Sequence, residues 1–249
     1  MAVDESTPLA DVWIYDLDRG TASRLTFDDV DESLPVWSPD DSTVYSARVP
    51  GRSDVYRRRV AGNSPPELVD GNPTDISPDG RWLLYRRDLR HGRFTLHVHD
   101  LVEDGSDRPW IDTPFSNRTG QIAPDGHWAA YVSDESGRLE VYLDRFPAPG
   151  EKFAVSTAGG VMPVWRPDGR ELYYWSAAGE IMAVSIELSE RPRIGAPVAL
   201  FPARLRTLGG YNPQFGVSRD GQRFLVNRVV DRAPTAPITL IQHWKTAAR

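Results

Sequence analysis

Short stretches in which apolar and polar residues alternate run along the whole chain, and a four-residue corner recurs between them. The corner has its fullest form in Ser77-Pro78-Asp79-Gly80 and returns in variant form at residues 38–41, 123–126, 166–169 and 218–221. Ser suits the first position of a type I turn, Pro presets φ at the second, and Gly ends the turn without a Cβ. The corner therefore predicts a tight turn between two strands.

The spacing of the corners predicts the architecture. Their aspartates follow one another at intervals that average 45 residues, at Asp40, Asp79, Asp125, Asp168 and Asp220. One motif repeated at this interval is typical of a four-stranded propeller blade. A β-sandwich is the competing all-β architecture, but it does not require one motif at a constant spacing.

Alternating positions around each corner predict the strands. One large apolar residue stands just before the corner, at Trp37, Ile76, Ile122, Trp165 and Val217. After the corner, period-two alternation predicts a second strand, with aligned apolar positions at Val44, Leu83, Ala129, Leu172 and Phe224. A third strand is predicted at residues 12–17, 55–60, 96–101, 141–146 and 181–186, and shorter runs at 24–26 and 153–156 predict a fourth. No segment has a sustained helical period, so the predicted fold class is all-β, a β-propeller of four-stranded blades.

We expect one propeller domain over residues 1–249. Complete blades are predicted at about 33–70, 72–114, 117–157 and 160–203, and partial blades at 11–27 and 211–245. If the two partial blades merge, the ring has five blades and one surplus strand. If they stay separate, the ring has six blades, one of them incomplete. The start of the chain within a blade favours a piece of a longer polypeptide.

Composition narrows the function classes. A net charge of −6 argues against a nucleic-acid partner, because such proteins usually carry a basic field. The absence of cysteine excludes disulfides, thiolate metal sites and cysteine catalysis. The sequence contains no run of about 18 apolar residues, the length that a membrane-spanning helix requires. Its first residues also lack the pattern of a signal peptide. We expect a monomer without a cofactor, and the sequence itself leaves the compartment open.

The corner, the aromatic residue before it and the apolar-x-Tyr strand after it resemble the TolB-like family of Trp-Asp-type propeller repeats over nearly the whole chain. Residues 221–225 and 238–240, with Trp244, are similar to the carboxy-terminal propellers of bacterial serine/threonine kinases. The resemblance implies ring faces that bind a protein or a small ligand, commonly in a periplasmic or other extracytoplasmic setting. We therefore expect a non-catalytic bacterial binding scaffold, as a fragment or domain of a larger TolB-like or kinase-linked protein.

An enzyme is the alternative, either a metal-dependent propeller lyase or hydrolase or the propeller half of a prolyl-oligopeptidase-like hydrolase. The sequence has no Gly-x-Ser-x-Gly elbow, no phosphate loop and no His-Glu-x-x-His motif, so no catalytic residue is predicted. His97 and His99 are candidate metal ligands, because side chains two apart on a strand point the same way. Both fall in columns of the blade alignment that hold other bulky residues, so packing is the competing interpretation.

Three arginines occupy the same position of the second strand in their blades. Arg48, Arg87 and Arg228 each follow the last residue of a corner by seven positions. This places them at the end of the strand farthest from the corner, where they would share one rim of the ring. The arrangement predicts a patch for an anionic partner, and ordinary surface charge is the competing interpretation.

Overall fold

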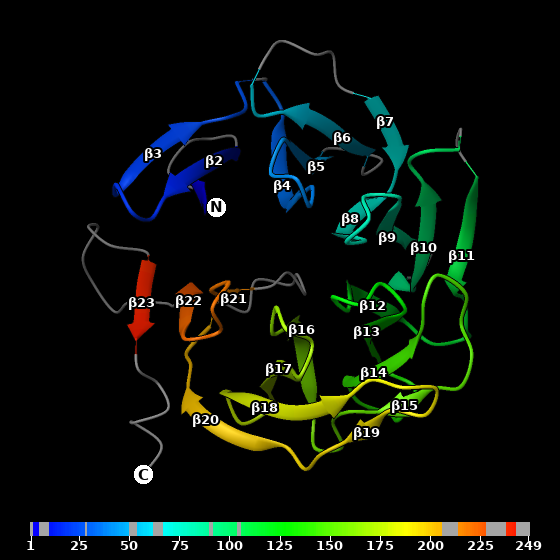
Figure 1. Ribbon diagram of the computed structural model, residues 1–249. Helices are drawn as coiled ribbons and strands as arrows, with labels where there is room; N and C mark the ends of the chain where they lie inside the picture. The colour runs from blue at the N-terminus through cyan, green and yellow to red at the C-terminus, as the bar shows by residue number, and fades with distance from the viewer. Residues whose placement is uncertain are drawn as a thin grey trace.

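The computed structural model describes residues 2–4, 10–27, 29–49, 54–61, 67–89, 92–103, 106–205, 214–227 and 238–242. Strands and turns make up this part of the chain, without an α-helix. The described residues accordingly include no helix that could cross a membrane. The strands form six antiparallel sheets arranged in a ring around a central axis (Figure 1). The predicted all-β propeller is confirmed.

Four consecutive sheets have at least four strands each. Sheet 2 consists of β4 (Asp31–Trp37), β5 (Thr43–Val49), β6 (Asp54–Arg59) and β7 (Glu67–Asp70). Sheet 3 consists of β8 (Asn72–Ile76), β9 (Trp82–Asp88), β10 (Phe94–Asp100) and β11 (Asp107–Ile111). Sheet 4 consists of β12 (Asn117–Ile122), β13 (Trp128–Ser133), β14 (Glu140–Arg145) and β15 (Phe153–Ala154). Sheet 5 consists of β16 (Gly160–Trp165), β17 (Glu171–Ser176) and β18 (Glu180–Glu187), with β19 (Arg193–Ile194) and β20 (Val198–Pro202) both pairing with β18.

The two ends of the chain form separate sheets of three strands. Sheet 1 consists of β1 (Ala2–Asp4), β2 (Asp11–Asp16) and β3 (Thr21–Arg24). Sheet 6 consists of β21 (Phe215–Val217), β22 (Arg223–Asn227) and β23 (Ile238–Gln242). Within the described residues no strand pairing joins these two sheets, and the number of blades stays a prediction. The alternation of apolar residues did not predict β1.

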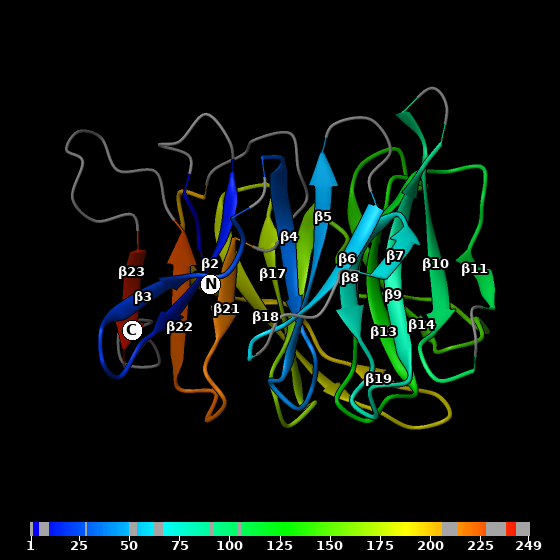
Figure 2. The ribbon, with the colours of Figure 1, turned by 90° about the horizontal axis from the view of Figure 1, so that it is seen from above.

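All five corners lie on one side of the ring. Each corner connects the inner strand of its sheet to the second strand, and the turns line the lower edge of the ring in Figure 2. We call this side the corner face and the other side the opposite face. The second strands run from the corner face to the opposite face, so their last residues lie on the opposite face.

Side-chain hydrogen bonds close the corner turns. In sheet 3, Gly80 N donates to Ser77 O at 2.8 Å, and Asp79 Oδ1 accepts hydrogen bonds from Ser77 Oγ and from the backbone N–H two residues further on. The equivalent Asp40 accepts hydrogen bonds from its two flanking serines, which lower its pKa to about 2. These aspartates therefore stay ionised, and their oxygens hold the turn.

Successive corners also contact one another around the axis. A methyl group on Gly126 would lie 3.8 Å from Pro78 Cδ of the preceding corner, and one on Gly169 would lie 3.7 Å from Pro124 Cδ. The proline ring of one corner therefore packs on the glycine of the next. The corner motif fixes the contact between neighbouring sheets as well as the turn itself.

Two inner strands are linked to their neighbours through a side chain. Asp75 Oδ2 in β8 accepts a hydrogen bond from Ile122 N in β12 at 2.7 Å. At the equivalent position one sheet further on, Gln121 Oε1 accepts a hydrogen bond from Trp165 N in β16 at 2.6 Å. An inner strand has no strand on its axial side, so these amides would otherwise lack a partner. The polar residue two positions before the corner supplies that partner.

Each of the four inner strands β4, β8, β12 and β16 also contains a bulge. The pairing register with the second strand shifts between Ser33 and Val36, and again at the corresponding place in the other three sheets. A bulge bends the strand and increases its twist. The bulges therefore bend the four inner strands, and the period-two pattern did not predict them.

The hydrophobic core lies between neighbouring sheets. Leu84, Leu96 and Trp110 of sheet 3 pack against Ile122 and Tyr131 of sheet 4, and all five side chains are buried. Three similar clusters join sheets 2 and 3, sheets 4 and 5, and sheets 5 and 6. Burial of these side chains is the main force that holds the ring together.

The connection into sheet 3 gives a first test of this packing. Gly71 has φ of 145°, and a methyl group there would lie 2.2 Å from Tyr85 Cδ2. We expect Gly71→Ala to lower the free energy of unfolding by more than about 2 kcal/mol, because both the backbone and the ring must move. Gly20→Ala is the control: its φ is 65° with no atom within 4 Å of the added methyl, and it should cost only about 1 kcal/mol. Equal losses in urea unfolding would contradict the close approach.

Asp75 predicts a pH dependence of stability. Burial of its carboxyl group raises its pKa from 3.8 to about 7. Hydrogen bonds from two backbone N–H groups lower the pKa, but burial has the larger effect. The native state therefore keeps this proton up to about pH 7, while the unfolded chain releases it near its ordinary pKa. The free energy of unfolding should fall as pH rises through that window, and Asp75→Asn should make the fall shallower. An unchanged pH profile for the variant in chemical unfolding would show that Asp75 does not titrate there.

Candidate functional site

The structure places two of the three predicted rim arginines on the opposite face, but each is already bound to a carboxylate. Arg48 Nε lies 3.2 Å from Glu32 Oε1, and its guanidinium carbon lies 3.9 Å from the centre of the Tyr56 ring. Arg87 Nη2 lies 3.2 Å from Asp107 Oδ2. Arg228 lies outside the described residues. The anionic-partner patch built on these three residues stays a prediction, and the two carboxylates offset the charge of its two described members.

Glu32 is the centre of a buried ion-pair cluster in sheet 2. Its side chain is 1% exposed, and it binds Arg48, Arg58 Nη2 at 3.4 Å and Ser46 Oγ at 2.8 Å. These partners come from the second and third strands, so the carboxylate joins three strands of one sheet. Arg48 therefore lies where its ion pair with Glu32 stabilises sheet 2.

The two candidate metal ligands lie on β10 and have other partners. His97 is buried, its Nε2 lies 3.0 Å from Thr95 Oγ1, and its ring lies 5.5 Å from that of Tyr85. His99 Nδ1 lies 2.9 Å from Asp107 Oδ1. No group of three His, Asp or Glu side chains that could hold a metal ion occurs among the described residues. His97 therefore packs within sheet 3 and His99 binds Asp107, and metal binding by this pair stays a prediction.

A hairpin in sheet 5 departs from the repeat. β18 continues beyond β20 and pairs with β19, so the hairpin tip at residues 188–192 reaches across to β14 and β15 of sheet 4 (Figure 1). Arg145 Nη2 of β14 donates to Glu190 O at 2.9 Å, and Arg191 Nη2 lies 3.4 Å from Glu151 Oε1. These bonds hold the tip against the neighbouring sheet.

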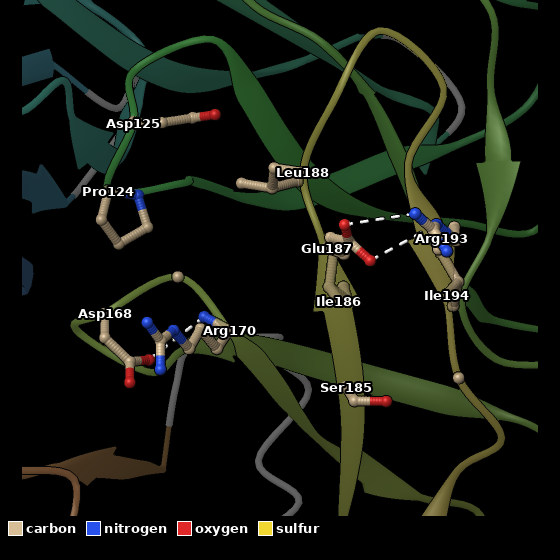
Figure 3. Close-up of a pocket in the computed structure, with 12 residues that line it drawn as sticks. Pro124, Asp125, Asp168, Arg170, Ser185, Ile186, Glu187, Leu188, Arg193 and Ile194 are labelled. Atoms are coloured by element: carbon tan, nitrogen blue, oxygen red, sulfur yellow. Dashed lines mark hydrogen bonds and ion pairs between the residues drawn. The ribbon is translucent and has the colours of Figure 1, made fainter.

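The hairpin and two corners line an open groove of about 830 Å³ on the corner face (Figure 3). Pro124 and Asp125 come from the corner of sheet 4, and Asp168 and Arg170 from that of sheet 5. Gly169 of the same corner also lines the groove, and the hairpin contributes Ser185, Ile186, Glu187, Leu188, Arg193, Ile194 and Gly195. Sequence reasoning missed this groove, although the interval of 52 residues between the last two corner aspartates, the longest of the four, is a signal of an added segment.

The charged groups of the groove differ in what they bind. Glu187 and Arg193 form an exposed ion pair at 3.3 Å. Asp168 accepts a hydrogen bond from Arg170 N at 3.1 Å, and its other oxygen lies 3.5 Å from Arg166 Nε. The Arg170 guanidinium has no hydrogen bond or ion pair within the part of the chain that the structure describes. It is exposed and available to a ligand.

The groove combines apolar and charged side chains. Leu188 and Ile194 give it half-buried apolar contacts, and charged side chains surround them. Its one hydroxyl, that of Ser185, has no histidine, lysine or carboxylate in hydrogen-bond contact among the described residues.

Comparison with known proteins shows the fold and no closer relationship. No family model matches the sequence, and a search of curated proteins finds no match to it. The solved structure of TolB from Acinetobacter baumannii is similar to 94% of this chain, with 17% identity and a TM-score of 0.73, and the chain spans 57% of that protein's length. A putative TolB from Agrobacterium tumefaciens is similar over 91% of this chain and 81% of its own, with 18% identity and a TM-score of 0.67.

Enzymes share this fold. An oligogalacturonate lyase in complex with manganese is similar over 95% of this chain and 69% of its own, with 14% identity and a TM-score of 0.60. Identities this low show a common propeller architecture alone. The TolB-like character predicted from the repeat is thus confirmed at the level of the fold, and the similarity to kinase-linked propellers stays a prediction.

The buried and exposed ion pairs give a test of the role of Arg48. Glu32→Gln should lower the free energy of unfolding by about 2 kcal/mol, because Arg48 and Arg58 would lose the carboxylate they enclose. Asp107→Asn, which removes the exposed partner of Arg87, should cost less than about 1 kcal/mol. If Glu32→Gln unfolds at the same urea concentration as the parent protein, the ion pair of Arg48 does not contribute to stability. Arg48 would then again be a candidate for partner binding.

Proposed function

We propose that this protein is a non-catalytic binding scaffold, and that it recognises a polypeptide segment in the groove on the corner face. The observation that carries this proposal is the hairpin of sheet 5, the described segment that leaves the blade pattern and forms an open groove. Loops that depart from a rigid repeat are where binding residues concentrate in such folds. An open groove suits a segment of a partner protein better than a small molecule, which usually needs an enclosing pocket.

Two further features support recognition over catalysis. The corner aspartates that repeat around the ring are engaged in their own turns, and the buried acidic groups such as Glu32 are engaged by arginines. The lyase with bound manganese demonstrates that a propeller can hold a metal, yet this chain has no triad of ligands for one in its described part. The likeness to TolB-like propellers supports an extracytoplasmic location. A place within a larger or kinase-linked protein remains a prediction from the sequence.

The groove predicts a specific effect of one arginine. Arg170 and Gln222 occupy the same position of neighbouring corners, and both backbone N–H groups bind the corner aspartate. Arg170→Gln therefore introduces a residue that this corner already tolerates, and it should leave the melting temperature unchanged. We expect it to weaken partner binding at least about tenfold, because an exposed arginine in a groove is a typical binding hot spot.

The matched control is Gln222→Arg, which adds an arginine to the next corner outside the groove. A partner captured from bacterial extract by the immobilised parent protein is purified, and its affinity for each protein is measured by calorimetry. Loss of affinity in Arg170→Gln with retention in Gln222→Arg supports the groove. Equal affinity of all three proteins would place recognition on another surface.

A further inference from the structure

Three of the five corners hold their aspartate with a serine hydroxyl. Ser38 Oγ donates to Asp40 Oδ1, and the equivalent serines donate in the corners of sheets 3 and 6. These hydrogen bonds lower the pKa of each aspartate below its ordinary value. The first position of the corner is Ala123 in sheet 4 and Arg166 in sheet 5. The two corners that line the groove are therefore the two that lack the serine.

Asp125 of the sheet 4 corner consequently has a single donor. His127 N donates to its Oδ1 at 2.9 Å, and its Oδ2 accepts no hydrogen bond within the part of the chain that the structure describes. In the next corner both oxygens of Asp168 are engaged, one by Arg170 N and the other by Arg166 Nε. An ionised carboxylate accepts up to about four hydrogen bonds. Asp125 is exposed, so its second oxygen is accessible to a cationic donor.

An apolar surface lies across the groove from this carboxylate. Asp125 extends from its corner toward the hairpin, and Leu188 extends from the hairpin toward the corners (Figure 3). Leu188 and Ile194 pack against the core between sheets 4 and 5, and both stay half-exposed. A lysine or arginine side chain has an apolar stem and a charged end. The two walls of the groove match these two parts.

Most other charges of the groove are paired within the protein. Glu187 binds Arg193, and Asp168 binds Arg166. Asp125 and Arg170 are the charged lining residues whose side chains form no ion pair among the described residues. They have opposite charges and come from neighbouring corners. A segment that pairs with both carries a basic and an acidic group, and the order of these groups fixes the direction in which the segment lies.

We propose that the segment bound in the groove carries a lysine or arginine, whose charged end binds Asp125 and whose apolar stem packs on Leu188. This inference rests on the proposed function, because it names the chemistry of the segment that the groove recognises. Asp125 is then a specificity-determining residue. The replacement of serine by Ala123 leaves its carboxylate accessible at this corner, and functional surfaces are where a repeat is expected to depart from its local rule.

Selection from a library of random short peptides displayed on phage tests this chemistry. The immobilised parent protein should enrich peptides in which a basic residue lies beside an apolar one. Asp125→Asn removes the charge and keeps an oxygen that accepts from His127 N, so the corner should hold. Against this variant the enrichment of lysine and arginine should disappear. Asp40→Asn is the matched control in a corner outside the groove, and it should select the same peptides as the parent protein.

A double-mutant cycle measures the contact itself. In one enriched peptide the basic residue is replaced by Gln, and the affinity of both peptides is measured by calorimetry. The replacement should weaken binding to the parent protein about fivefold, as loss of an exposed ion pair does. It should leave the affinity for Asp125→Asn unchanged, because the partner charge is already absent there.

Ala123→Ser provides a second variant that preserves the fold. Ser77 occupies the same buried position in the corner of sheet 3, where its hydroxyl donates to the aspartate. A serine at position 123 should donate to Asp125 in the same way and compete with the basic residue of the peptide. We expect it to weaken binding of the basic peptide about twofold and to leave binding of the Gln peptide unchanged. If Asp125→Asn fails to fold, equal effects of Ala123→Ser on both peptides overturn the inference.

The outcomes separate this inference from the proposed function. Enriched peptides that lose affinity for Arg170→Gln occupy the groove. If such peptides carry no basic residue, or if Asp125→Asn selects basic residues as the parent protein does, the inference is overturned and the scaffold function stands. If no peptide is enriched, or if enriched peptides bind the parent protein, Arg170→Gln and Asp125→Asn equally, both are overturned.

Discussion

The contact between the inner strands of neighbouring sheets is the constraint on which the rest of this ring depends. An inner strand has a free edge toward the axis, and its amides need partners that no strand supplies. Asp75 and Gln121 supply them to Ile122 and Trp165 of the next sheet. Pro78 and Pro124 pack on the glycine of the following corner. Apolar clusters between the sheets complete an interface that fixes how each sheet lies against the next.

This fixed interface leaves the two faces of the ring free to differ. On the corner face, one extended hairpin creates a groove, and the remaining corners keep their common form. On the opposite face, most described arginines near the strand ends are bound to carboxylates such as Glu32 and Asp107. The groove therefore arises where a segment departs from the repeat.

The sequence predicted the parts of the structure that repeat. Corners at a regular interval and period-two strands are local signals, so the all-β propeller and most strands could be read from the chain. The bulges, β1 and the division between β19 and β20 leave no such local signal. The sequence also did not predict the ion pairs of Glu32, because its partners Arg48 and Arg58 are distant in sequence and contact it only across strands. The candidate groove depends on the path of a hairpin over the neighbouring sheet, which only the folded chain defines.

Native-state hydrogen exchange at the backbone amides of Ile122 and Trp165 tests the central constraint most directly. Both amides lie on the axial edge of an inner strand, whereas the adjacent amides of Ala123 and Arg166 bind the second strand of their own sheets. We expect all four amides to exchange with similar protection, because a side chain from the preceding sheet replaces the missing strand. Exchange of Ile122 and Trp165 at the rate of unprotected amides, beside protected neighbours, would contradict it.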